Sequence, residues 1–209
     1  MVQTIGTIIA TRQEPKDLKE LPRLCVSSTK MVSSLTGKFP TLEDFCKACS
    51  PSAQQRYVSE PLSAFYRQTA TLTDLNNAYK SKDAAASWLV PQLYNVSEFC
   101  GCKNKITNEQ LADIATLLAS SYPYVKVSEF LLFFAWFKAG KYGKFYGNVD
   151  PMVITTAFRE FMQDRGRKYA EIENILAERK REEEKKKPHY TRKQWLERML
   201  QEVWEHRDD

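Results

Sequence analysis

Apolar residues recur three and four positions apart along most of the chain, which is the period of an amphipathic α-helix. Thr107 and Gln110 have the spacing of a capping box, and Tyr122 with Pro123 forms a stop signal. The stretch between them presents one apolar stripe, made of Leu111, Ile114, Ala115, Leu117 and Leu118. We therefore predict a helix that begins after Thr107 and ends near Tyr122.

Two further helices are predicted downstream of this one. Residues 129–138 are apolar on nearly every side, which is typical of a buried helix, and we expect Ser128 to cap it. Asp150 followed by Pro151 predicts the start of the next helix, because an Asp side chain accepts free backbone N–H groups and proline suits the first helical position. Its helical spacing continues sparsely into the charged run 178–187.

The remaining segments give weaker signals. Thr41 and Asp44 predict a cap for a short helix that ends near Cys49, and Pro91 should break or kink a helix over 84–94. Residues 1–38 carry scattered apolar residues and two prolines, so we expect a weakly structured arm. At the other end, Thr191 and Gln194 form another capping-box pair before an amphipathic stripe.

These patterns predict an all-α protein in three parts. A flexible N-terminal arm spans 1–38, a helical core domain spans 39–166, and a charged helical extension with a terminal amphipathic helix spans 167–209. With 43% hydrophobic and 12% aromatic residues, the 209-residue chain can build one core of ordinary size.

Composition and charge limit the compartments and partners that we expect for this protein. The most apolar run, Phe130 to Phe137, is far shorter than the roughly 20 residues of a membrane-spanning helix, and the N-terminus has no basic stretch followed by an apolar one. Five cysteines without an export signal favour a reducing cytoplasm over a secreted disulfide scaffold. The net charge of +5 and a pI near 8.9 permit contact with nucleic acid without deciding it.

The most unusual stretch runs from residue 138 to 147. Its lysines would contact phosphate, its aromatic rings would stack on bases, and its glycines would present backbone N–H groups to anions, which is the combination used to bind single-stranded DNA. These residues are Lys138, Lys141 and Lys144; Tyr142, Phe145 and Tyr146; and Gly140, Gly143 and Gly147. Alternatively, the glycines turn the chain while the aromatic rings pack on the core. The pattern lacks the Gly-Lys-Ser/Thr ending of a P-loop, so nucleotide hydrolysis is not supported.

The cysteines and histidines give little support for a metal site or for catalysis. Two close pairs, Cys46 with Cys49 and Cys100 with Cys102, invite a zinc interpretation, but ordinary thiols explain them better because the spacing is irregular and no histidine lies near. His189 and His206 lie in the charged tail, and no nucleophile sits in an activating motif. We expect no catalysis, no metal and no cofactor.

The C-terminal region offers a different kind of site. The mixed-charge run 178–187 is typical of a solvated helix. Alternatively, it is a spacer that projects the terminal amphipathic helix towards a partner. The partner-binding residues would be Trp195, Leu196, Met199 and Trp204. If that helix folds back instead, these residues are simply core.

One stretch resembles a known group of proteins. The apolar run 130–137, the 138–147 loop and the Asp150-Pro151 pair together resemble a poorly characterised family of gut Bacteroides-type bacteria and their phages and mobile elements, over about residues 107–165. The resemblance implies a mobile-element protein, such as a helicase-loader-like replication accessory. It carries no catalytic residues.

Two functions follow from the sequence. The first is a non-enzymatic adaptor that binds single-stranded DNA through the 138–147 loop. The second is a protein-interaction module that binds a replication protein or another protein through its C-terminal helix and needs no nucleic acid. Neither requires a membrane.

Overall fold

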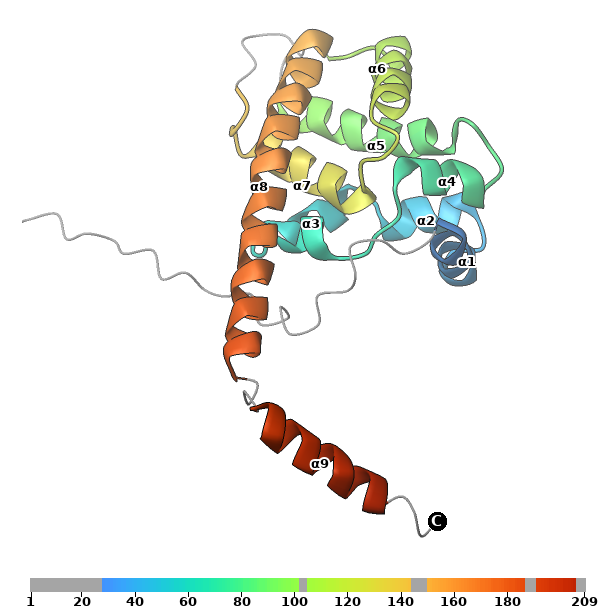
Figure 1. The fold of residues 1–209 in the computed structure, drawn as a ribbon. Coiled ribbons are helices and arrows are strands. Elements are labelled where there is room, and N and C mark those ends of the chain that lie inside the picture. The colour runs from blue at the N-terminus through green and yellow to red at the C-terminus, as the bar shows by residue number, and fades with distance from the viewer. Residues whose placement is uncertain (1–27, 102–104, 144–149, 187–190, 206–209) are drawn as a thin grey trace, which may run out of the picture. The chain divides into compact units, whose positions relative to one another are not determined.

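The chain is mostly helical in the part that its structure, a computed structural model, describes (Figure 1). That part comprises residues 28–101, 105–143, 150–186 and 191–205, with side chains up to Gln201. Over these residues the structure contains helices and no strand, and an isolated bridge joins Thr71 to Lys126. The predicted all-α class is confirmed.

The helices follow one another with short connections. In chain order they are α1 (Ser28–Lys38), α2 (Leu42–Ala48), the 3-10 helix η2 (Pro51–Tyr57), α3 (Ser63–Tyr66), α4 (Leu72–Ala78), α5 (Ala84–Phe99), α6 (Asn108–Ser121), α7 (Val127–Lys138), α8 (Pro151–Lys186) and α9 (Arg192–Glu205). The chain forms one compact unit up to Tyr169 and a second from Ala170 to Asp209. Among the described helices, none has the combined length and apolar character that crossing a bilayer requires.

Part of the predicted arm is a helix. Residues 28–38, which we assigned to the flexible arm, form α1, while residues 1–27 lie outside the described part of the chain. Leu35 is buried, and the Ser28 hydroxyl donates a 2.7 Å hydrogen bond to the Asp74 carboxylate on α4. The Ser- and Thr-rich sequence does not predict this helix, because the stability of α1 comes from packing on α4 rather than from the apolar pattern of α1 itself.

Three of the predicted caps form as capping boxes. Thr41 with Asp44, Thr107 with Gln110 and Thr191 with Gln194 each exchange the paired side-chain-to-backbone hydrogen bonds of this motif. Thr71 with Asp74 forms a further box, at the start of α4, that the sequence analysis did not single out. Asp150 also caps as predicted, since its carboxylate accepts from the Met152 backbone N–H at 2.8 Å.

Removing one such cap has a defined expected effect. Thr107→Ala should lower the free energy of unfolding by about 1 kcal/mol, because the Gln110 backbone N–H loses its acceptor. Thr116→Ala, the same change at an exposed position inside α6, should alter it by less than about 0.5 kcal/mol. Urea unfolding of both variants measures the difference. Equal losses would show that the cap does not hold the start of α6.

The start of α7 differs from the prediction. The helix begins at Val127 with Lys126 as its N-cap, and Glu129 at the third position accepts from the Lys126 backbone N–H at 3.0 Å. Ser128 therefore does not cap the helix. Its side chain is buried and its hydroxyl donates to the Ala64 carbonyl at 2.7 Å, because packing against α3 places it away from the free N–H groups.

Proline 91 neither breaks nor ends its helix. α5 runs without interruption from Ala84 to Phe99 with Pro91 inside it. Leu89 and Leu93, on either side of the proline, are completely buried. The packing of α5 offsets the lost backbone hydrogen bond, which is how tertiary contacts override a local breaker.

The core is built around α7, as its all-apolar sequence predicts. Phe130 and Phe133 of α7 are fully buried and pack against Phe158 of α8, with ring centroids 4.7 Å and 4.9 Å apart. Phe161 lies one turn further along α8 and contacts Phe133 at 5.5 Å. The first part of α8 is thus fastened to the compact unit by aromatic packing.

Candidate functional site

The glycine-rich loop begins as a helix terminator. Gly140 has a φ of +79°, its N–H donates to the Phe137 carbonyl, and the Lys141 N–H donates to the Trp136 carbonyl at 3.0 Å. This pair of hydrogen bonds is the Schellman motif, which favours glycine at the left-handed position because glycine has no Cβ. The N–H groups of residues 140 and 141 are therefore used by α7 itself and are not free to bind an anion.

Both described lysines of this stretch contact their own chain. The Lys138 ammonium donates to the Asn95 side-chain carbonyl at 2.8 Å and lies 5.5 Å from the centre of the Phe99 ring. Burial lowers its pKa. The Lys141 ammonium pairs with Asp164 at 2.8 Å and sits 3.5 Å above the Trp136 ring. Each of these ammonium groups already holds the end of α7 against a neighbouring helix.

Tyr142 does not present a ring for stacking on a base. Only 7% of its surface is exposed, and its ring packs against Phe133 and Phe161. Its hydroxyl donates to the Asp164 carboxylate at 3.0 Å, and burial together with this hydrogen bond raises its pKa. This part of the predicted site is corrected: the tyrosine belongs to the core, as the alternative interpretation of the loop expects.

The rest of the predicted loop site lies outside the described residues. This applies to Lys144, Phe145, Tyr146 and Gly147, whereas Gly143, with a φ of +110°, is described. The structure thus brings Lys141 and Tyr142 together on Asp164, but around a carboxylate of α8 rather than around an open groove.

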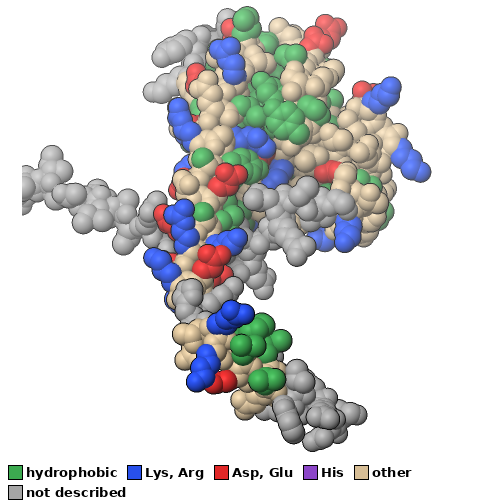
Figure 2. All heavy atoms as spheres, viewed as in Figure 1, with side chains coloured by type: hydrophobic (Ala, Val, Ile, Leu, Met, Phe, Trp, Pro, Cys, Tyr) green, Lys and Arg blue, Asp and Glu red, His purple; other side chains and the backbone are tan. Residues whose placement is uncertain are grey.

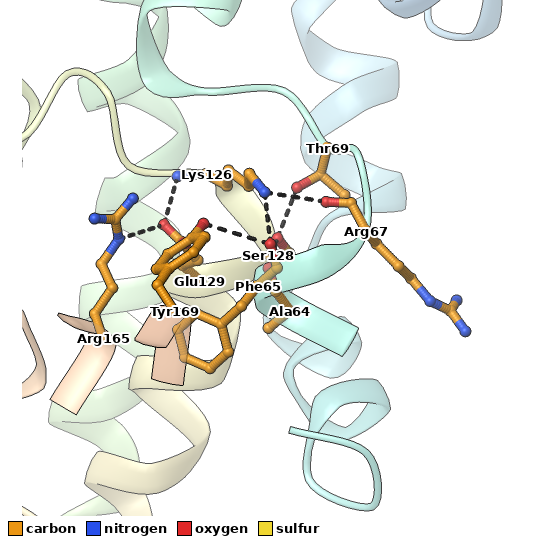
Figure 3. Close-up of polar contacts among 9 residues, drawn as sticks. All are labelled: Ala64, Phe65, Arg67, Thr69, Lys126, Ser128, Glu129, Arg165 and Tyr169. Atoms are coloured by element: carbon orange, nitrogen blue, oxygen red, sulfur yellow. Dashed lines mark hydrogen bonds and ion pairs between the residues drawn. The ribbon is translucent and has the colours of Figure 1, made fainter. Parts of the chain in front are cut away.

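A buried polar network that the sequence analysis missed lies between α7 and α8 (Figure 3). Glu129 is completely buried, and its carboxylate accepts from the Arg165 Nε at 3.1 Å and from the Tyr169 hydroxyl at 2.6 Å. It also accepts from the Lys126 backbone N–H. Both oxygens therefore have partners from the chain itself, so the network fastens α8 to α7.

Lys126 extends the same network towards α3. Its half-buried ammonium donates to the backbone carbonyls of Phe65 at 2.7 Å and Arg67 at 3.3 Å, and burial lowers its pKa. Ser128, beside it, accepts from Thr69 and donates to Ala64 (Figure 3). A glutamate inside an otherwise apolar run was the available sequence signal, because a buried carboxylate needs partners. Its partner Arg165 lies 36 residues away, so sequence spacing gave no link.

The terminal helix exposes its apolar side chains. Trp195, Leu196, Met199 and Leu200 are 52%, 47%, 42% and 60% exposed, and Figure 2 shows hydrophobic side chains gathered on α9. We call these four residues the α9 stripe. The side chain of Trp204, which we also predicted to bind a partner, lies outside the described residues. Every described residue of α9 is exposed.

The cysteines do not form a metal site in the described part of the chain. No group of three or more His, Cys, Asp or Glu residues is placed there to hold an ion, and Cys102 lies outside it. Cys46 and Cys49 are partly buried free thiols at the end of α2. The Cys49 carbonyl accepts from the Trp88 and Gln92 side chains, which ties this turn to α5.

The Cys49 thiol should react slowly at neutral pH. Burial raises its pKa to about 11, above the value of an ordinary thiol, so its thiolate fraction, and with it the rate of alkylation, should rise about tenfold per pH unit up to at least pH 10. The rate for a cysteine in a short unstructured peptide should level off above about pH 8.5. Iodoacetamide labelling followed by mass spectrometry measures both rates. Levelling of Cys49 near pH 8.5 would contradict the burial of this thiol.

One of the comparisons with known proteins gives a match for this chain. Residues 105–202 match the model of a family of unknown function, DUF6633. The match begins just before α6 and ends in α9, so it includes Glu129, Arg165, Tyr169 and the α9 stripe. It also contains residues 107–165, which carry the resemblance to an uncharacterised family. No curated protein and no solved structure matches the chain.

Proposed function

We propose that this protein is a non-enzymatic adaptor that binds another protein through the α9 stripe. The observation that carries the proposal is the exposure of four large apolar side chains on one helix, all of them between 42% and 60% exposed. Scattered single apolar residues are normal on protein surfaces, but a contiguous group that includes a tryptophan is typical of an interaction site.

The spacing of the stripe suits a helix that lies in a groove. Trp195 with Met199 and Leu196 with Leu200 are pairs four positions apart, and Leu196 with Met199 is three apart. Residues at these spacings lie on one side of an α-helix, which is how amphipathic helices place their anchors in a partner's apolar groove. The helix also begins with its own capping box, so it does not depend on packing to define its start.

Charge supports a protein groove as the partner. The described part of α9 outside the stripe carries Arg192, Lys193 and Arg198 together with Glu197, so both signs flank the apolar residues. A polar rim around an apolar centre is the usual anatomy of a protein interface.

A site-specific crosslinker tests this proposal. Photoreactive benzoylphenylalanine replaces either Leu196, on the stripe, or the adjacent Glu197, and the chain is irradiated in the cells that produce it. We expect the Leu196 position to yield one dominant protein adduct and Glu197 to yield at least tenfold less. Equal adducts from the two positions, or none from Leu196, would overturn the proposal.

The nucleic-acid hypothesis has weaker support. Lys138, Lys141 and Tyr142 contact their own chain, so binding of single-stranded DNA would depend on Lys144, Phe145 and Tyr146. Anisotropy of a labelled oligonucleotide at two salt concentrations distinguishes the two functions, because phosphate contacts weaken steeply with salt. Salt-sensitive binding that Lys144→Ala abolishes would favour the DNA adaptor over the protein adaptor.

The resemblance of residues 107–165 suggests where such an adaptor works. It supports a phage or mobile-element protein that serves as a replication accessory, with a replication protein as the partner of α9. The crosslinked adduct identifies that partner by mass spectrometry, and an adduct with no role in replication would contradict this assignment.

A further inference from the structure

A cavity of about 180 Å³ lies in the compact unit, remote in sequence from both the 138–147 loop and α9. Five segments line it: α1, the α2 region, η2, the chain at 68–70 and the start of α7. α1 contributes Met31, Ser34, Leu35 and Lys38, which share one side of the helix. The cavity therefore exists only because α1 folds, although the sequence pattern predicts a flexible arm for those residues.

The inner wall of the cavity is largely apolar, and two of its hydroxyls are already hydrogen-bonded inside the protein. Phe45, Ala70 and Val127 line it and are buried. Ser128 and Thr69 also line it, but Ser128 donates to the Ala64 carbonyl, so Thr69 must donate to Ser128. The two hydroxyl protons are thus used inside the protein, and a ligand beside Phe45, Ala70 and Val127 would contact carbon. The other uncharged polar side chains of the lining belong to Ser34, Tyr57 and Gln68.

The mouth of the cavity is positively charged. Lys38 and Arg56 both line the cavity, both are exposed, and no Asp or Glu is among the lining residues. Within the described residues neither cation forms an ion pair or a hydrogen bond. The Cys49 thiol in the wall stays protonated at neutral pH because burial raises its pKa, so it adds no negative charge.

From this arrangement we propose that the cavity binds a small carboxylic acid with a compact apolar body, its carboxylate at Lys38 and Arg56 and its hydrocarbon part against Phe45, Ala70 and Val127. A cavity of about 150 Å³ is enough to hold a benzene ring, so this one suits a single ring or a chain of about six to eight carbons. The cations set the preference for an anion, and the apolar wall sets the affinity.

Calorimetric titration of the full chain with octanoate, octan-1-ol and octylamine tests the charge preference. We expect octanoate to bind at least tenfold more tightly than octanol, and octylamine not to bind. Shortening the acid to hexanoate should weaken binding by about fourfold per CH₂ removed. Arg56→Glu should weaken octanoate at least tenfold and allow octylamine to bind, whereas Lys82→Glu, the same reversal at an exposed lysine away from the cavity, should change neither.

Alkylation locates the site independently. Cys49 lines the cavity and Cys46 does not, and trypsin cleavage after Lys47 places the two thiols in different peptides. At pH 9, saturating octanoate should slow iodoacetamide labelling of Cys49 at least fivefold and leave Cys46 unchanged. Equal binding of octanoate and octanol, or equal labelling of Cys49 with and without octanoate, would overturn the proposal. Neither result bears on partner binding by α9.

Discussion

Phe158→Ala should be among the most destabilising single changes in this protein, with a loss of about 3–5 kcal/mol in the free energy of unfolding. Phe158 is completely buried and its ring contacts Tyr122, Phe130, Phe133 and Phe161. Truncation removes these contacts and leaves a cavity that the rigid surrounding rings cannot fill. Urea unfolding followed by circular dichroism measures the loss.

Phe99→Ala is the matched control for this change. Phe99 is 62% exposed and touches the Lys138 ammonium, so its truncation should cost less than about 1 kcal/mol. If the two variants lost similar amounts of unfolding free energy, Phe158 would not hold α8 to the core. That result would contradict a stabilising role for the aromatic packing between α7 and α8.

Glu129→Ala should lower the free energy of unfolding by nearly as much as Phe158→Ala, about 3–5 kcal/mol. The change leaves the Arg165 guanidinium, whose side chain is only 21% exposed, without its carboxylate, and it removes the acceptor of the Tyr169 hydroxyl and of the α7 cap. An uncompensated cation in a partly buried position is strongly unfavourable. Glu173→Ala, at an exposed position of α8, should change the stability by less than about 0.5 kcal/mol.

A double-mutant cycle separates the pair from the rest of the network. The combined change Glu129→Leu with Arg165→Met removes both charges and should be less destabilising than the sum of the two single changes, because neither charge is then left alone. Strict additivity would mean that Glu129 and Arg165 do not interact, which would contradict the 3.1 Å contact.

The features that the sequence predicted correctly depend on residues close together in the chain. Thr107 and Gln110 define the start of α6 by themselves, and the apolar run of α7 predicts that this helix is buried. The α9 stripe is likewise visible in the sequence, because its spacing alone identifies one face of a helix.

The features that the sequence missed depend on distant partners. α1 is stable because it packs on α4 and bonds Asp74, 46 residues after Ser28. Ser128 looked like a cap because Ser suits that position, yet its hydroxyl donates to the Ala64 carbonyl. Tyr142 looked like a stacking residue in a polar loop, but Asp164 and Phe161 hold it in the core. Local patterns cannot show which of several favourable partners tertiary packing selects.

The central claim, that α9 is an interaction helix rather than part of the fold, is tested most directly by the paired change Leu196→Ser and Leu200→Ser. We predict that the free energy of unfolding changes by less than about 0.5 kcal/mol, because both side chains are already exposed, while recovery of the partner identified by crosslinking falls at least tenfold. Arg192→Ser with Lys193→Ser, on the polar side of the helix, should retain the partner. Full recovery of the partner by the Leu196 and Leu200 variant would contradict the claim.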